Sequence, residues 1–177
     1  VDVKTAFQGL PSLKAGEVNN SYTNLSNDYV EQNFLQDSQT PLTQNIARPN
    51  NSNDLAIYKI VAEAKKNGKN IKYSELDSKL KNHKHTDKFL DRFKALSWNS
   101  PSHTVVAHIS KDGHHYIHPD TKQNRSITVR EAARLQGFPD NYYFLDSRTS
   151  AFTQIGNAVP PIFSKKMADA ILTLEFK

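Results

Sequence analysis

The residues best suited to chemistry lie in the stretch RSITVREAARLQGFPD, residues 125–140, which sets three arginines around one glutamate. A guanidinium group is a rigid fork of donors that fits a carboxylate, a phosphate or backbone carbonyls. We therefore expect these side chains to brace a neighbouring segment or to hold a phosphate, unless they simply lie in solvent or pair with acids. They are Arg125, Arg130, Glu131 and Arg134.

A second stretch, QIGNAVPP at residues 154–161, follows shortly afterwards. It predicts a glycine turn at Gly156 before a helix whose first turn accommodates prolines. Backbone amides at such a helix start can hold a polar ligand group. An apolar series at helical spacing then continues the helix, namely Phe163, Met167, Ile171 and Leu174.

Composition limits two other chemistries. The chain has no cysteine, which excludes a disulfide, a thiolate metal site and a cysteine nucleophile within it. It has seven histidines, among them His108, His114, His115 and His118. Because neighbouring histidines on a strand point to opposite faces, we predict no metal site and assign these rings to the polar lining of a groove.

Local signals indicate the elements that must position these residues. Thr128 and Glu131 form a capping box, and the helix that they open ends at Gly137. Further upstream, residues 104–109 and 114–117 are rich in strand formers on either side of Asp112 and Gly113. This pattern predicts a β-hairpin over residues 103–118.

Residues 53–94 predict a basic helical insertion. A first helix is capped by Asn53, runs through Asn67 and stops at Gly68, a shorter one opens at Ser74, and a third carries Phe89, Leu90 and Phe93. Between residues 59 and 94 there are eleven Lys and Arg side chains against five acidic ones, which suits a phosphate backbone. A solvated lysine-rich face is the alternative.

The remaining sequence is less informative. The stretch 16–53 is dense in Asn, Ser, Gln and Thr and predicts loop or extended surface rather than core. The chain of 177 residues has a net charge of +5 and a mean hydropathy of −0.67, which indicate one soluble core and no membrane span. Residues 1–50 carry three basic against five acidic side chains, so the positive charge lies in the later part.

The two stretches at 125–140 and 154–161 together closely resemble the last two motifs of DNA cytosine-5 methyltransferases. The segments WNSPSHT at 98–104 and KDGHHYIHPD at 111–120 resemble the recognition region of the bacterial members. VKTAFQGLPSLKAGE at 3–17 resembles the segment that follows their core motifs. The resemblance covers nearly the whole chain and is closest over residues 98–177.

This resemblance implies transfer of the methyl group of S-adenosylmethionine to C5 of a cytosine flipped out of double-stranded DNA. A cysteine thiolate attacks C6 while a glutamate supports the ring nitrogen. In the family, the cofactor glycines, the Pro-Cys nucleophile and the Glu-Asn-Val motif precede the part matched here. Because this chain contains none of them, we expect no catalytic residue in it and no methyl transfer by the chain alone.

The resemblance also assigns supporting roles to residues of this chain. One group completes the cofactor pocket where the C-terminal helix folds back on a Rossmann-like core, a second braces the base of the recognition domain, and a third faces DNA. The cofactor group is Asn157, Ala158 and Val159; the bracing group is Arg125, Arg130, Glu131 and Arg134; the DNA group is Thr104, Lys111, Asp112 and Gly113.

The expected fold is therefore α+β. Residues 1–124 form a small recognition lobe with a β-hairpin and short helices, and residues 125–177 form C-terminal helices that pack on an absent Rossmann-like α/β catalytic core. The apolar series after Pro161 is expected to be exposed in the chain alone.

Two sources of the catalytic core stay open. It belongs either to a longer chain of which this sequence is a fragment, which the start at Val1 favours, or to a partner subunit of a split enzyme. A different class also stays open, namely a non-catalytic, sequence-specific DNA-binding module. For the methyltransferase the resemblance implies a cytoplasmic bacterial protein, commonly of a restriction–modification system.

Overall fold

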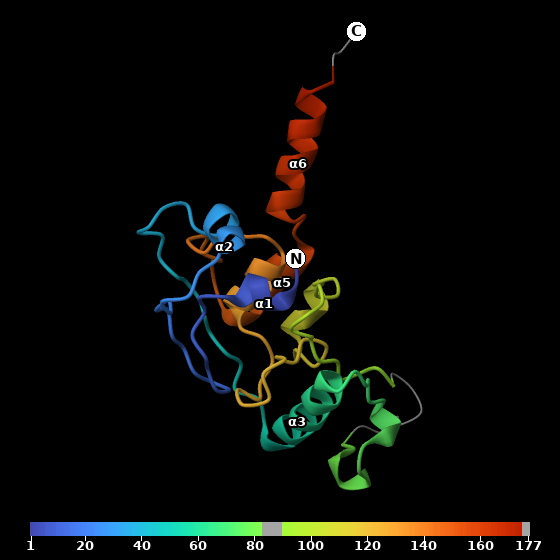
Figure 1. Ribbon diagram of the computed structural model, residues 1–177. Coiled ribbons are helices and arrows are strands. Elements are labelled where there is room, and N and C mark those ends of the chain that lie inside the picture. Colours follow the sequence, from blue (N-terminus) through green and yellow to red (C-terminus); the bar gives the residue numbers. More distant parts are fainter. Residues whose placement is uncertain (83–89, 175–177) are drawn as a thin grey trace.

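The computed structural model describes residues 1–82 and 90–174, in which helices are joined by long irregular segments (Figure 1). Within this part no extended strand forms, and β-type pairing is limited to the isolated bridges Val18–Ile46, Ala95–Ile117 and Ile117–Ser126. The helices are α1 (Val3–Phe7), α2 (Asp28–Asn33), α3 (Ser52–Lys66), α4 (Val129–Leu135), α5 (Arg148–Asn157) and α6 (Pro161–Leu172), with the 3-10 helices η1 (Tyr73–Glu75), η2 (Ser78–Leu80) and η3 (Ala107–Ser110).

The predicted hairpin over residues 103–118 is wrong. Its first strand is replaced by η3, in which the Ile109 N–H donates to the Val106 carbonyl at 3.0 Å. The Tyr116 hydroxyl donates to the Thr104 carbonyl at 2.9 Å and accepts from the Val106 N–H at 3.2 Å. Because these bonds satisfy the backbone locally, the segment presents no ladder to a partner strand. The β-hairpin of the predicted α+β fold is therefore absent from the described residues.

Two hydrophobic clusters form the core. The larger one joins α1, α2, α4 and α5 to the segment around η3, and Val129, Ala132 and Phe152 are among its members. The smaller one packs α3 against η1 and the segment that contains Phe93 and Ala95. The larger cluster takes residues from both sides of residue 124. The predicted division into domains at residue 124 stays a prediction.

The capping box that opens α4 is confirmed. The Thr128 hydroxyl accepts from the Glu131 N–H at 3.0 Å, and the Glu131 carboxylate accepts from the Thr128 N–H at 2.7 Å. Gly137 follows the helix with a φ of +80°, in the left-handed region that favours glycine. The Gln136 side chain then donates to the Ile155 carbonyl at 2.9 Å, which joins α4 to α5.

The helical insertion is confirmed in its first helix and wrong in its second. α3 begins two residues earlier than predicted, with Asn51 as its cap, and ends before Gly68. The helix expected from Ser74 is divided into η1 and η2, because Asp77 accepts from the Lys79 N–H at 2.8 Å and starts a new turn. Of the third predicted helix, Phe89 lies outside the described residues, and residues 90–93 are not helical.

The polar stretch 16–53 is mostly exposed and irregular, as predicted, but parts of it pack into the core. It contains α2, and Val30 and Phe34 belong to the larger cluster. Asn45 is fully buried: its amide donates to the Asn19 carbonyl at 3.0 Å and its oxygen accepts from the Thr128 hydroxyl at 2.7 Å. Asn45 can be buried because its amide makes these hydrogen bonds, so that burial leaves neither its nitrogen nor its oxygen unpaired.

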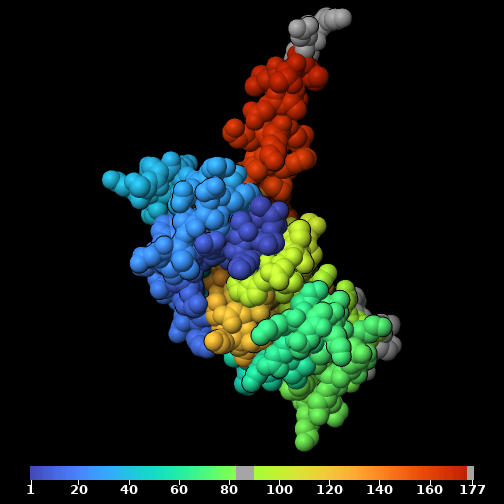
Figure 2. Space-filling model, in the orientation of Figure 1, coloured from blue at the N-terminus to red at the C-terminus, as the bar shows by residue number. Residues whose placement is uncertain are grey.

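α6 projects from the body of the molecule (Figures 1 and 2). Pro161 is its first residue, in agreement with the predicted proline start. The predicted exposed apolar face is confirmed for this chain, since Phe163, Met167, Ile171 and Leu174 are between 47% and 61% exposed. No helix among the described residues combines the length and the apolar character needed to cross a membrane.

Gly156 does not form the predicted turn, because it lies inside α5. A Cβ atom at this position would lie 2.2 Å from the Ala107 nitrogen and 2.3 Å from the Val106 carbonyl carbon. The glycine is required by the close approach of α5 to the backbone of η3 rather than by a change of chain direction.

Candidate functional site

A buried ion pair joins α4 to the segment before it. Arg125 is fully buried, and its two terminal nitrogens each donate to one oxygen of Glu131 at 2.7 Å. The same guanidinium donates to the Leu13 carbonyl at 3.1 Å and to the Gln123 side chain at 2.6 Å. The pair therefore connects the N-terminal segment to α4 as well as satisfying itself.

Arg130 holds a different set of segments. Its guanidinium donates to the carbonyls of Thr43 and Pro139, both at 2.8 Å, and to that of Tyr142 at 2.6 Å. Burial, together with the neighbouring Arg134, lowers the pKa of Arg130 to about 10 against the opposing effect of Asp140. The side chain remains a cation at neutral pH and bonds mainly backbone oxygens.

Arg134 completes the set. It forms a two-bond pair with Asp140 at 2.9 and 2.5 Å and donates to the carbonyls of Ala6 and Gln8 at 2.9 and 2.8 Å. Its guanidinium also lies 5.1 Å from the centre of the Phe34 ring. The three arginines are thus at most 2% exposed and are engaged within the protein.

Glu131 is ionised in this environment. Burial alone would raise the pKa of its carboxyl group, but Arg125 and His118 outweigh burial and hold the pKa below its ordinary value. His118 lies 3.5 Å from one carboxylate oxygen and stacks on Phe7 at a ring separation of 5.9 Å. His118 therefore belongs to the buried centre and not to the predicted groove lining.

The residues predicted to face DNA lie on either side of η3: Thr104 precedes it, and Lys111, Asp112 and Gly113 follow it. Thr104 and Lys111 are exposed, whereas Gly113 is buried with a φ of +77°. A Cβ atom on Gly113 would lie 3.0 Å from that of Ser126, so this position lets the chain turn beneath the surface. Asp112 accepts from the His114 N–H at 3.0 Å. The structure therefore brings these four residues into one segment, and it leaves Thr104 and Lys111 as the exposed members.

A second buried contact ties this segment to the insertion. The Tyr58 hydroxyl on α3 lies 2.8 Å from Nδ1 of His114, and burial raises the pKa of Tyr58 above its ordinary value. His114 is itself packed against Phe93 at a ring separation of 4.4 Å. His114, like His118, is buried rather than part of a polar groove.

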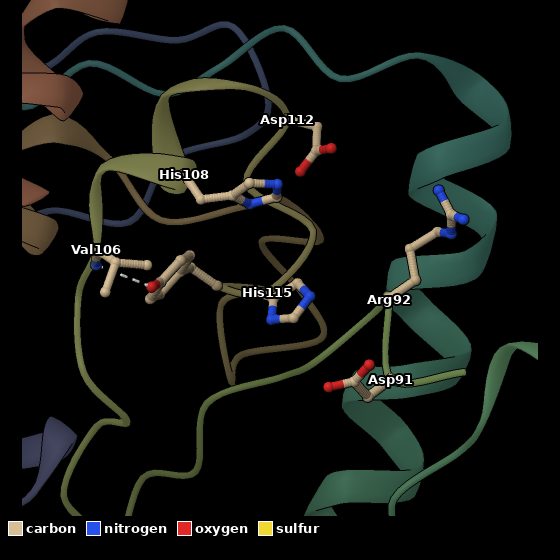
Figure 3. Close-up of a pocket in the computed structure, with 7 residues that line it drawn as sticks. Asp91, Arg92, Val106, His108, Asp112 and His115 are labelled. Carbon is tan, nitrogen blue, oxygen red and sulfur yellow. Dashed lines mark hydrogen bonds between the residues drawn. The ribbon is translucent and has the colours of Figure 1, made fainter. Parts of the chain in front are cut away.

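A cavity of about 550 Å³ lies beside residues 106–116 (Figure 3). Two of the predicted groove histidines, His108 and His115, line it with their rings 6.0 Å apart. Two carboxylates, of Asp91 and Asp112, and one cation, Arg92, bound the cavity, so it offers acceptors and a donor to a polar ligand. Its lining is Asp91, Arg92, Val106, His108, Asp112, His115 and Tyr116.

The predicted cofactor residues lie at the end of α5. Asn157 is its last residue and is exposed, and within the described part of the chain its carboxamide has no hydrogen-bond partner. Ala158 is half-buried, and its carbonyl accepts from Gln136 at 3.3 Å. Val159 is exposed. This edge offers one polar and one apolar side chain to a ligand, while Ala158 fixes it to α4.

Sequence reasoning missed Arg48, which bonds the backbone at the end of η3. Its terminal nitrogens donate to the carbonyls of Ile109 and Lys111 at 2.9 and 2.8 Å. The only available signal was its isolation as the sole basic side chain between residues 15 and 58. No cluster of metal-ligating side chains forms among residues 1–82 and 90–174.

Comparisons with known proteins complete the description. The sequence pattern of the C-5 cytosine-specific DNA methylase family matches residues 5–173. The chain is 53% identical over 138 residues to the type II methyltransferase M.Bpa9945I of Bacillus paralicheniformis, an alignment that covers 78% of this chain and 31% of that protein. It is 44% identical over 71 residues to the DNA (cytosine-5-)-methyltransferase M.ApeKI of Aeropyrum pernix, covering 40% of this chain and 15% of that protein.

Among solved structures, a similar chain is a protein encoded within an Escherichia coli prophage and described as a DNA modification methyltransferase. It is 27% identical, and the match covers 97% of this chain and 46% of that one with a TM-score of 0.48, which is too low to establish a shared fold. The chain therefore spans less than a third of the two curated relatives and less than half of this structure.

Proposed function

The chain belongs to the C-5 cytosine-specific DNA methylase family, and we propose that it supplies the DNA-recognition and cofactor-pocket-completing part of a DNA (cytosine-5)-methyltransferase. The observation that carries the proposal is the packing of α5, which ends at Asn157, directly on η3, which leads to the exposed Lys111. A cofactor edge and a DNA-facing turn on adjoining elements suit an enzyme that must bring a methyl donor and DNA together.

The proposed reaction transfers a methyl group from S-adenosylmethionine to C5 of a flipped-out cytosine. A thiolate must add to C6 of the ring, and this chain has no cysteine. The nucleophile therefore comes from a catalytic core in the same longer chain or in a partner subunit. We propose that this chain alone does not transfer methyl groups.

The chain's own contribution to DNA binding is electrostatic and positional. α3 carries Lys59 and Lys66 on exposed positions, and Lys111 is exposed after η3. Such side chains neutralise phosphates without reading sequence, so their contribution weakens as salt rises. Base reading falls to the segment from Thr104 to Asp112, beside the cavity of Figure 3.

The cofactor edge fits part of S-adenosylmethionine. The Asn157 carboxamide is exposed and can donate to or accept from a polar group, and Val159 offers an apolar contact. The cofactor supplies the methyl group, and these residues hold its edge. The fixed Ala158 carbonyl keeps Asn157 and Val159 in place.

The rest of the chain supports these two surfaces. The buried pairs of Arg125 with Glu131 and of Arg134 with Asp140, together with Arg130, brace the base of the recognition lobe. The apolar face of α6 packs on the Rossmann-like α/β core. An exposed apolar series of this length on an isolated helix is expected of an element that normally has a partner.

The test measures methyl transfer from labelled S-adenosylmethionine to duplex DNA. It compares this chain alone with this chain plus a chain that carries the cofactor glycines and the Pro-Cys motif. We expect transfer only in the mixture. Transfer by the rigorously purified chain alone would contradict the proposed division of labour. Sequence-specific DNA binding without transfer in the mixture would instead identify a non-catalytic DNA-binding module.

A second experiment separates the cofactor edge from the DNA surface. In the active mixture, Asn157→Ala is expected to raise the KM for S-adenosylmethionine severalfold and leave DNA affinity unchanged. Asn70→Ala removes the same carboxamide from an exposed loop after α3 and serves as the matched control. An unchanged cofactor KM in Asn157→Ala would remove this residue from the proposed pocket.

A further inference from the structure

The end of η3 is held by a side chain from a distant segment. Arg48 donates from Nη1 to the Lys111 carbonyl at 2.8 Å and from Nη2 to the Ile109 carbonyl at 2.9 Å, with Ser110 at 3.4 Å. The last carbonyls of a helical turn have no partner within the turn. One guanidinium therefore satisfies three successive carbonyls immediately before the turn at Asp112 and Gly113.

Arg48 is at the same time fixed to α5. Its guanidinium carbon lies 5.3 Å from the centre of the Phe152 ring, which is buried in the larger cluster. Burial lowers the pKa of Arg48, and the nearby Arg148 lowers it further, yet a guanidinium remains charged at neutral pH. A half-buried cation is tolerated here because carbonyl oxygens accept from its two terminal nitrogens and an aromatic face lies against it.

The opposite end of η3 is fixed by backbone contact with the same helix. Gly156 of α5 approaches Val106 and Ala107 so closely that a Cβ atom would lie within 2.5 Å of three of their atoms. η3 is therefore held at its start by α5 and at its end by Arg48. The exposed Lys111 and the turn that follows it have little freedom to move relative to these supports.

We propose that Arg48 is a positioning residue for DNA recognition. It acts through the backbone of residues 109–111 and fixes the direction in which the Lys111 and Asp112 side chains leave the surface. This inference rests on the proposed function, because it assumes that the turn faces DNA. The inference goes further than that function, because it assigns a role in sequence discrimination to a side chain outside the segment from Thr104 to Asp112.

A positioning role predicts more than a loss of stability. Without Arg48, three carbonyls lose their donor and the turn samples several backbone directions. Base contacts that depend on direction then weaken, whereas phosphate contacts, which tolerate displacement, largely remain. Discrimination between sites should therefore fall more than total DNA affinity.

The experiment uses the active assembly of this chain with its catalytic core and a duplex library with randomised sequence around a central cytosine. Methylated positions are read by bisulfite sequencing, which gives the ratio of methylation at the preferred site to that at sites differing by one base. Arg48→Met is expected to lower this ratio at least about fivefold, since one good base contact is worth about 1–3 kcal/mol. The KM for S-adenosylmethionine should stay unchanged.

Arg130→Met is the matched control, because Arg130 also bonds backbone carbonyls through its guanidinium but bonds none in η3. It is expected to lower thermal stability and, below the melting temperature, to lower the ratio much less than Arg48→Met does, because it braces the base of the lobe and does not bond η3. Arg48→Lys keeps the charge with a single donor group and should restore part of the ratio. It also provides a second variant where Arg48→Met fails to fold.

The outcomes separate the two proposals. If the wild-type assembly is active and the assemblies with Arg48→Met and Arg48→Lys keep full discrimination, the positioning role alone is overturned. Equal losses in the Arg48→Met and Arg130→Met variants also overturn it, because they would follow from general destabilisation. A wild-type assembly that neither binds nor methylates DNA overturns both this inference and the proposed function.

Discussion

Replacing Glu131 by glutamine is expected to cost the protein about 3–5 kcal/mol of folding free energy. The guanidinium of Arg125 is fully buried and gives both of its terminal nitrogens to Glu131 at 2.7 Å. Glutamine keeps the shape and is accepted at the third position of a capping box, so the helix cap survives. The substitution therefore removes mainly the charge that balances Arg125 and leaves a buried cation unpaired.

Urea unfolding followed by circular dichroism at pH 7 measures this cost. Thermal unfolding measures the same cost in another way. For a domain of this size, a loss of 1 kcal/mol in the free energy of unfolding lowers the melting temperature by about 2–4 °C, so that of Glu131→Gln should fall by roughly 6–20 °C. Asp169→Asn is the matched control, because it removes the charge of an exposed pair, Lys165–Asp169, at 3.6 Å. These side chains are 79% and 63% exposed, and such pairs contribute about 0–1 kcal/mol.

The pH dependence gives an independent check of the same pair. The folded-state pKa of Glu131 is lowered, so its stabilisation is present above its ordinary pKa of 4.5 and is lost as pH falls below that value. The difference between wild type and Glu131→Gln should therefore be full at pH 7 and narrow in acid. A cost at pH 7 no larger than that of Asp169→Asn would refute the view that this buried pair holds α4 in place.

Three further predictions concern other parts of the molecule. Burial and the charge of Lys94 lower the pKa of His103 to about 4, so an NMR titration should find it well below 6.5, and a value at or above 6.5 contradicts its half-buried placement against Tyr116. Gly156→Ala should lower the free energy of unfolding by about 1–3 kcal/mol, because α5 must move away from η3; unchanged urea unfolding would contradict the close approach. In the chain alone, amide protons of α6 should exchange faster than those of α4, and strong protection of α6 would show that its apolar face is already covered.

The helices that carry sequence-local signals could be predicted, and those that depend on distant contacts could not. The capping box of Thr128 and Glu131 lies within four residues and acts through bonds between those residues, so the start of α4 is readable. The proline start of α6 is local in the same way. α3 was also readable from its apolar spacing, although Asn51 and not Asn53 provides the cap.

The prediction of a hairpin over residues 103–118 is wrong because the same residues are compatible with two local structures. Strand-forming side chains around Asp112 and Gly113 favour a hairpin only when the two arms can pair with each other. Here Ile117 instead bridges to Ala95 and Ser126, and Tyr116 bonds the backbone of the first arm through its hydroxyl. Neither contact can be foreseen from alternation within residues 103–118.

The sequence indicates correctly that Gly156 is structurally required, but the predicted reason, a turn, is wrong. The sequence marks it as special, and a turn is the usual explanation for a glycine before prolines. The actual constraint is the distance between two backbones, about 50 residues apart in the sequence, that pack without room for a side chain. This contact is also what makes the proposed cofactor edge and the proposed DNA-facing turn parts of one rigid support.

Arg48 was missed because its partners are backbone carbonyls, which carry no sequence signature. It lies 61 residues from Ile109 and 63 from Lys111, in a stretch whose composition indicates surface loop. A carboxylate partner such as Glu131 for Arg125 is visible in the sequence as an opposite charge, whereas a carbonyl partner is not. Side chains that organise recognition through the backbone are therefore expected to be found only when the fold is known, and Arg48 is the residue in this chain for which that distinction can be tested by substitution.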